Sequence, residues 1–238
     1  MNLIKIKKAI RALFWRRDLR ALRYGVAASA EHSACLRRLK GIRTLVDIGA
    51  NKGQFALEAT KWHDATVIAF EPLKHERGLV ERIFSDRENF TVYPFALGSA
   101  DGEIDFNVSA ASDSSSVLDQ TALQTDHFPA TQNARKEKVA IRRLDHVIDK
   151  ASLVHPALCK IDVQGYELVT LEGFGDLIAS FDYLIVELSN VSFYAGAPNS
   201  AEVISHLAGR GFHIENIYNI YRKDGVCLQA DFLFARNS

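Results

Sequence analysis

The first residues that could take part in binding or catalysis lie in the segment VDIGANKGQF, in which Asp47 precedes Gly49 and Gly53. Glycine is needed where the chain turns with a positive φ or where a ligand lies against bare backbone. The D-x-G-x-x-x-G spacing differs from the G-x-G-x-x-G of dinucleotide-binding enzymes. A carboxylate before the glycines repels a pyrophosphate but suits an ammonium group. The motif therefore favours S-adenosylmethionine, through its methionine end, over NAD.

A second carboxylate, Glu71, ends the next apolar run in AFEP, eighteen residues after Gly53. A carboxylate at this place can accept hydrogen bonds from both ribose hydroxyls of an adenosine. The alternative is a solvated side chain at a strand end. The register of Glu71 with the first motif favours the binding role.

A third group lies in CKIDVQGYE, residues 159–167, where Asp162 follows an apolar strand and Gly165 allows a turn. Ligands of open α/β sheets bind beyond the carboxyl ends of the strands. Asp162 is therefore expected to share a cleft with Asp47 and Glu71. There it could take a proton from a substrate hydroxyl, orient that hydroxyl or hold part of the cofactor. It could also merely cap the following helix.

Two further residues are catalytic candidates. His127 is the histidine best placed for a general base, because it lies in the polar segment 101–138, although most lone loop histidines are only solvated. Glu187 ends the apolar run YLIVEL at the same edge of the expected sheet as Asp162. These two carboxylates could converge on a hard divalent ion. Because no tight cluster of ligands is visible, no metal is expected.

Alternating strands and helices must position these residues. From residue 44 the repeated alternation predicts a mostly parallel sheet with helices on both faces. Segment 101–138 interrupts the alternation and is either a substrate loop or a mobile insertion. Strands are expected over 44–48, 65–70, 90–95, 103–108, 139–142, 157–161, 183–188, 212–217 and 231–235, the last one antiparallel, and helices over 55–62, 74–84, 144–149, 166–173 and 199–207.

Charge divides the chain in two. Residues 1–43 carry twelve Lys and Arg against two acidic residues, which leaves the remainder with seventeen basic and twenty-seven acidic residues. A mildly acidic body excludes a general nucleic-acid-binding role. The chain has no run of about 18 uncharged apolar residues, so no transmembrane segment is expected. It also has no secretory signal pattern, and a cytoplasmic location is expected.

The basic excess belongs to residues 1–42, an extension that precedes the domain of residues 43–238. Apolar residues at helical spacing predict a helix that ends near Gly25, and a second helix is expected over 28–39. A basic amphipathic helix could contact an anionic membrane surface through residues 1–24. The simpler interpretation is a helical arm that packs on the main domain or on a second subunit of a homo-oligomer.

Several motifs in one order are similar to those of the FkbM-type methyltransferases. They are VDIGANKGQF, FEP, ALG at 96–98, S-S-x-L at 115–118, KIDVQG and VEL, and the resemblance spans residues 43–235. The sequence departs from the family pattern at Gln164, where the family usually has Glu. A role that needs negative charge there is lost, whereas a hydrogen-bonding role survives.

The resemblance implies a Rossmann-like class I methyltransferase fold with seven strands, and S-adenosylmethionine as methyl donor. It also implies O-methylation of a hydroxyl on a sugar, a glycan or a natural product, with Asp162 at the reacting centre. The rival hypothesis is a non-catalytic protein of the same fold that binds a partner through its basic arm. The residues that the resemblance assigns to the cofactor are Asp47, Gly49, Asn51, Gly53 and Glu71, with Ala96 and Leu97 near the adenine.

Overall fold

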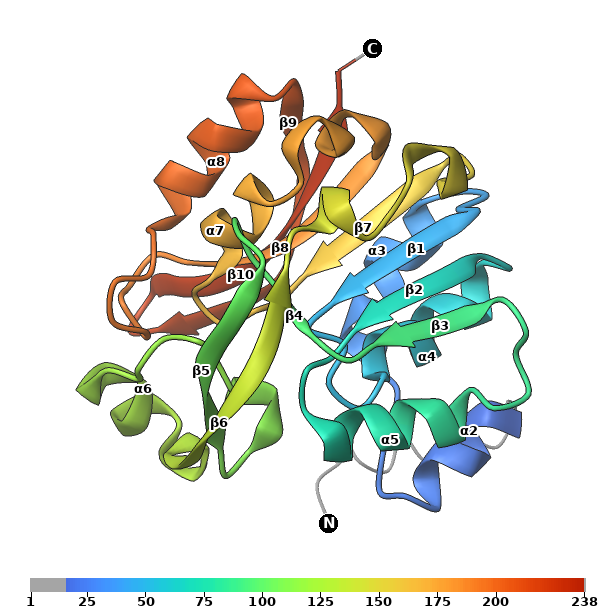
Figure 1. The fold of residues 1–238 in the computed structure, drawn as a ribbon. Helices are drawn as coiled ribbons and strands as arrows, with labels where there is room; N and C mark the ends of the chain where they lie inside the picture. The colour runs from blue at the N-terminus through green and yellow to red at the C-terminus, as the bar shows by residue number, and fades with distance from the viewer. Residues whose placement is uncertain (1–15, 238) are drawn as a thin grey trace.

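The computed structural model describes residues 16–237. A seven-stranded sheet lies at the centre of this part of the chain (Figure 1). The strand order is β3-β2-β1-β7-β8-β10-β9. The first five strands pair in parallel, and β10 runs antiparallel to β8 and β9. This topology confirms the predicted Rossmann-like class. The strands are β1 Thr44–Ile48, β2 Thr66–Phe70, β3 Phe90–Tyr93, β7 Ala157–Ile161, β8 Tyr183–Ser189, β9 Phe212–Lys223 and β10 Val226–Arg236.

Apolar side chains cover both faces of this sheet. In β1, Leu45 packs into one core cluster, while Val46 and Ile48 pack into another. Successive residues of a strand point to opposite faces, so a strand buried on both sides needs apolar residues at every position. Helices α3, α4 and α5 cover the first face, and α7 and α8 the second. Their bounds are α3 Ser33–Arg38, α4 Gln54–Trp62, α5 Lys74–Ile83, α7 Glu167–Glu172 and α8 Ser200–Gly209.

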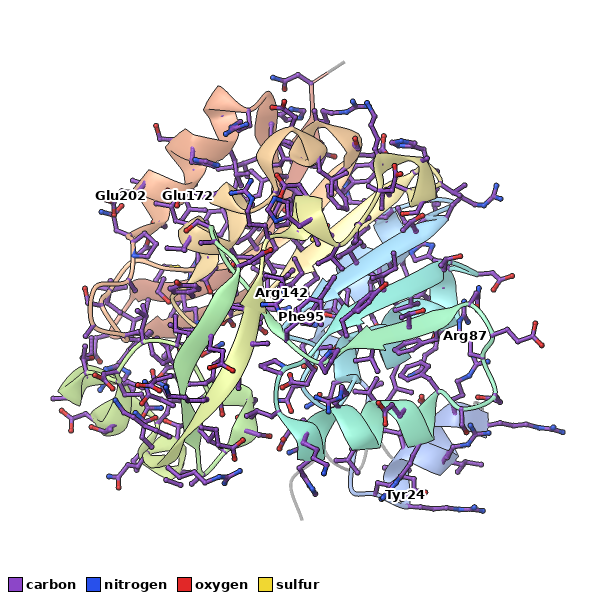
Figure 2. All side chains as sticks on the ribbon, viewed as in Figure 1. Tyr24, Arg87, Phe95, Arg142, Glu172 and Glu202 are labelled. Carbon is purple, nitrogen blue, oxygen red and sulfur yellow. The ribbon has the colours of Figure 1, made fainter. Side chains whose placement is uncertain are left out.

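Both ends of segment 101–138 belong to a second, smaller sheet. Its strands lie in the order β4-β6-β5, and β5 and β6 form an antiparallel ribbon. The strand expected over 139–142 begins at Asn133 in the structure. Polar residues on the exposed face of an antiparallel ribbon do not prevent its strands from pairing. Figure 2 shows Phe95 and Arg142 where the two sheets meet. The elements are β4 Ala96–Leu97, β5 Gly102–Ser109, β6 Asn133–Arg142 and α6 Ala122–His127.

Several expected elements have different ends in the structure. The strand expected over 90–95 stops at Tyr93, because Pro94 cannot donate a ladder hydrogen bond. The helix expected over 144–149 is a single turn, η4 (Leu144–His146), since the Asp149 side chain accepts a hydrogen bond from the next turn instead. The last two strands extend into a long ribbon. Further short turns are η2 Ser112–Ser114, η3 Pro129–Thr131, η5 Lys150–Ser152 and η6 Gly175–Ser180.

The described part of the N-terminal arm packs against the α4 and α5 side of the sheet. It contains α2 (Arg16–Leu22) and η1 (Ala30–His32), so a short turn and α3 replace the single helix expected over 28–39. Asp18 of α2 lies 2.6 Å from the Lys61 ammonium of α4, and both side chains are buried. The apolar positions that predicted the first helix lie outside the described residues. Between residues 16 and 237, no helix is long and apolar enough to cross a membrane.

Candidate functional site

A cavity opens at the carboxyl ends of β1, β2 and β7. Together with the open solvent at its mouth it spans about 1030 Å³ of empty space, and small-molecule sites are typically concave clefts of this kind. Parallel strands bring their carboxyl ends to one edge of the sheet, so motifs far apart in the sequence meet there. The lining comes from within residues 29–32, 48–55, 70–73, 95–97, 106–117 and 160–166.

The glycine loop follows β1 and makes one wall. Gly49 has a φ of +76°, and a Cβ there would overlap the backbone carbonyl oxygen of Asp162. Glycine is thus required by the close approach of two backbone segments rather than by space for a ligand. Gly53 has a φ of +81° and starts α4, and it does not line the cavity. Asn51 lines the cavity, and its Oδ1 accepts a hydrogen bond from the Ser112 hydroxyl over 3.2 Å.

Asp47 lies beneath this loop and is completely buried. Burial raises the pKa of its carboxyl to about 6, although the nearby Lys160 ammonium acts in the opposite direction. Neither carboxylate oxygen has a hydrogen-bond partner of normal geometry among residues 16–237. A buried acceptor without a partner is costly. Asp47 is therefore a strong candidate to bind a cationic or hydrogen-donating group.

Glu71 lies at the end of β2 and is only 5% exposed. Its two oxygens accept hydrogen bonds from the backbone N–H groups of Asn51 and Leu73, each over 2.8 Å. Burial raises the pKa of the Glu71 carboxyl to about 8, and those two N–H groups limit the rise. Each oxygen keeps a second lone pair for a ligand hydroxyl. The geometry thus suits a pair of ribose hydroxyls.

The wall beside Glu71 is apolar. Phe95, Ala96 and Leu97 line the cavity at the start of the small sheet. The Phe95 ring packs on Phe70 with ring centroids 5.7 Å apart. A flat aromatic base can be accommodated against such a surface, because it gains apolar contact without losing hydrogen bonds.

Lys160 and Asp162 face the cavity from the end of β7. The Lys160 ammonium lies 2.8 Å from Oδ2 of Asp162. Burial opposes ionisation of Asp162, yet the Lys160 ammonium holds the pKa of this carboxyl below its usual value. Burial also opposes the charge of Lys160, but Asp162 and Asp47 raise its pKa. The two groups are a carboxylate and an ammonium at neutral pH.

Gln164 joins Asp162 to Glu187. Its amide nitrogen donates hydrogen bonds to one carboxylate oxygen of each residue, both over 2.7 Å, and its amide oxygen accepts a 2.8 Å bond from the Tyr194 hydroxyl. Burial, together with the charges of Asp162 and Asp231, raises the pKa of Glu187 well above its usual value. Glu187 thus contacts the site through Gln164 and does not itself line the cavity. Among residues 16–237, no three His, Cys, Asp or Glu side chains are grouped to hold a metal ion.

His127 is not brought to the cavity. Its ring lies at the end of α6, where Nδ1 is 3.3 Å from the Tyr221 hydroxyl and Nε2 is 3.4 Å from the Lys223 ammonium. The rings of Phe128 and Phe193 pack around it. This aromatic cluster lies against the β9–β10 ribbon and holds His127 away from Asp162.

Two groups of lining residues were missed from the sequence. Ser29, Glu31 and His32 belong to the N-terminal arm, and no motif marks them. Lys160 and Gln164 flank Asp162; the sequence predicted no role for Lys160 and only a hydrogen-bonding role for Gln164. Alternation along the strand KID could have indicated Lys160, because every second side chain of a strand points to the same face.

Comparison with known proteins agrees with this geometry. The family described as Methyltransferase FkbM domain matches residues 47–214, more than half of the chain. The hexuronic acid methyltransferase AglP of Haloferax volcanii is 30% identical over 149 residues, which are 60% of this chain and 55% of that protein. The chain thus spans little more than half the length of this relative.

Two solved structures are similar to this chain at low sequence identity. A candidate tRNA (m1A22) methyltransferase of Streptococcus pneumoniae, in complex with S-adenosyl-L-methionine, gives a TM-score of 0.50 at 10% identity, covering 89% of this chain and 74% of that one. An rRNA methylase of Streptococcus thermophilus gives 0.48 at 12% identity, covering 87% and 94%. At such identities the first likeness shows a shared fold and nothing about the substrate.

Proposed function

The chain belongs to the FkbM methyltransferase family, and on that premise we propose that it transfers a methyl group from S-adenosylmethionine to a hydroxyl of a sugar, a glycan or a related small molecule. The observation that carries the proposal is that Glu71 and Asp162 line one cavity at the edge of the sheet, with Asp47 buried beneath its glycine loop. S-adenosylmethionine as the donor follows from the family.

The donor fits the polar groups at the cavity. Glu71 would accept hydrogen bonds from the two ribose hydroxyls with its remaining lone pairs. Ala96 and Leu97 would lie against the adenine. Asp47, whose buried oxygens have no partner of normal geometry in residues 16–237, would attract the ammonium of the methionine end. Asn51 and the turn at Gly49 would shape the loop around that end.

Asp162 is the residue proposed to handle the acceptor. When bound, S-adenosylmethionine supplies a methyl group on a sulfonium, already activated for in-line displacement, so positioning and water exclusion are the main tasks of the protein. The Asp162 carboxylate would orient the acceptor hydroxyl and take its proton. Gln164 holds Asp162 in place and ties it to Glu187.

A sugar-type acceptor is supported by the relative in Haloferax volcanii, which is named for a hexuronic acid. A hexuronic acid carries several hydroxyls and one carboxylate. Methylation of a hydroxyl gives a methyl ether, and methylation of the carboxylate gives a methyl ester. An assay with radiolabelled S-adenosylmethionine and a panel of neutral sugars, hexuronic acids and oligosaccharides would identify the acceptor. We expect the label in a methyl ether, which survives mild alkali. A methyl ester would be hydrolysed under the same conditions.

Calorimetry tests the donor. We expect one site for S-adenosylmethionine and for its demethylated product, S-adenosylhomocysteine, and no binding of NAD. Tight NAD binding without a response to either sulfur ligand would overturn the assignment. Donor binding with no turnover on any acceptor would favour the rival hypothesis of a non-catalytic binding protein.

A further inference from the structure

Three residues ahead of the family-matched span line the cavity. Ser29, Glu31 and His32 lie in the arm, before residue 47, yet they share the cavity with the glycine loop and with β7. The backbone N–H of Ser29 donates a 3.0 Å hydrogen bond to the carbonyl of Gln54, at the start of α4. The arm is thus fastened at the point where it enters the cavity.

His32 is held in place from two sides. Its Nε2 lies 3.0 Å from Oδ2 of Asp231 on β10, which also accepts a 2.6 Å hydrogen bond from Asn219. Its ring meets the Phe55 ring edge-on, with centroids 5.0 Å apart. The Lys160 ammonium lies 5.6 Å from the centre of the same Phe55 ring. His32 and Lys160 therefore both lie beside the Phe55 ring.

The strand order tells which end of the donor comes here. The order β2-β1-β7 places Glu71, Asp47 and Lys160 one after another across the sheet edge. A donor whose ribose is bound by Glu71 must extend its amino-acid end across β1 toward β7. That end carries both an ammonium and a carboxylate, so it needs anionic and cationic partners together.

The side chains there match both charges. Asp47 is the anion for the ammonium. For the carboxylate, the Ser29 hydroxyl and Nδ1 of His32 are buried and have no hydrogen-bond partner of normal geometry among residues 16–237. With Nε2 facing Asp231, Nδ1 is the ring atom of His32 that is left to face a carboxylate.

We propose that residues 29–32 of the arm form the binding wall for the amino-acid end of the methyl donor, with His32 and Ser29 contacting its carboxylate and Asp231 positioning His32. This inference rests on the proposed function, since it presumes that the cavity binds S-adenosylmethionine. It adds two parts of the chain, one before and one after residues 47–214, to the donor site.

The test compares two ligands that differ only at that end. S-adenosylhomocysteine has the amino-acid end, whereas 5′-methylthioadenosine has the same thioether adenosine without it. In His32→Ala the Kd for S-adenosylhomocysteine should rise roughly tenfold or more, the scale of a lost hydrogen bond to a charged group. The Kd for 5′-methylthioadenosine should stay within about twofold of its wild-type value, because this ligand lacks the group that His32 contacts. Asp231→Asn should show the same selectivity with a smaller effect.

His63→Ala is the matched control, because His63 is equally buried and does not line the cavity. It should leave the ratio of the two Kd values unchanged. If His32→Ala does not fold, as judged by circular dichroism, Ser29→Ala takes its place in the comparison with wild type, and the same selective weakening is expected. Equal weakening of both ligands, or no weakening, would overturn the proposal. A wild-type protein that binds neither ligand would instead contradict the proposed function.

Discussion

The ammonium of Lys160 lies 2.8 Å from a carboxylate oxygen of Asp162, and both side chains line the cavity beside the glycine loop. An ion pair at this place gives Asp162 a fixed direction and keeps it ionised. It also lowers the basicity of Asp162, so we expect this carboxylate to orient the acceptor hydroxyl as well as to take its proton.

Asp162→Asn keeps the shape of the side chain and removes its charge. We expect kcat to fall by roughly 100-fold or more, the scale usual for a lost general base. The Kd for S-adenosylhomocysteine, measured by calorimetry, should change little. Weaker donor binding with full turnover at saturation would instead assign Asp162 to the donor. Glu187→Gln is the companion variant, because Glu187 contacts Gln164 but does not line the cavity.

Lys160→Met removes the charge that holds down the pKa of Asp162. The pKa of this carboxyl should then rise, so the carboxylate form is lost at a higher pH than in the wild type. The acid limb of the kcat/KM profile should move to higher pH. Lys61→Met is the control, since Lys61 is also buried but pairs with Asp18 in the arm. An unmoved acid limb in Lys160→Met would show that Asp162 ionisation does not limit the reaction.

Glu71 makes the free protein less stable as the pH rises. Burial raises its pKa from 4.5 to about 8, so the folded state binds this proton more tightly than the unfolded state does. The contribution to stability is full below pH 4.5 and is lost as the pH rises through about 8. The Tm of Glu71→Gln relative to wild type should therefore be higher at pH 8.5 than at pH 5. Donor binding should be weakened at both, and a pH-independent Tm difference would contradict the shift.

Gly49→Ala should destabilise the fold, because Gly49 has a positive φ and its Cβ would overlap the Asp162 carbonyl. Gly25→Ala is a matched control, with a similar φ of +71° and nothing within 4 Å of the added Cβ. The control should cost about 1–3 kcal/mol from backbone strain alone. Chemical denaturation should show a clearly larger loss in Gly49→Ala. Equal losses would mean that the β1 loop can move away from β7.

Deletion of residues 1–24 should lower the Tm, because it removes Ala21 from the core and leaves buried Lys61 without Asp18. Glu58 still pairs with Lys61 at 3.1 Å, so the loss should be smaller than the roughly 3–5 kcal/mol typical of a buried charge left unpaired. Sedimentation with anionic liposomes tests the separate hypothesis that these residues contact a membrane, and loss of sedimentation in the deleted form would support it. An unchanged Tm would contradict the packing role of the arm.

Much of this protein was predictable from local pattern. Strand–helix alternation predicted the parallel sheet, because burial on both faces demands nearly continuous apolar strands with helices between them. The rule that ligands bind at the carboxyl ends of parallel strands brought Asp47, Glu71 and Asp162 to one edge. The motifs around them also predicted the family, which the match over residues 47–214 confirms.

Other features depend on contacts between distant residues. His127 seemed a candidate base because it lies in a polar segment, but the aromatic rings around it hold it away from the cavity. His32 has no motif, and only the packing of the arm against Phe55 and Asp231 brings it to the cavity. Periodicity and spacing report the local chain and the face that each residue presents. Which distant side chains meet is decided by tertiary packing, because burial and pairing energies depend on neighbours that lie far away in the sequence.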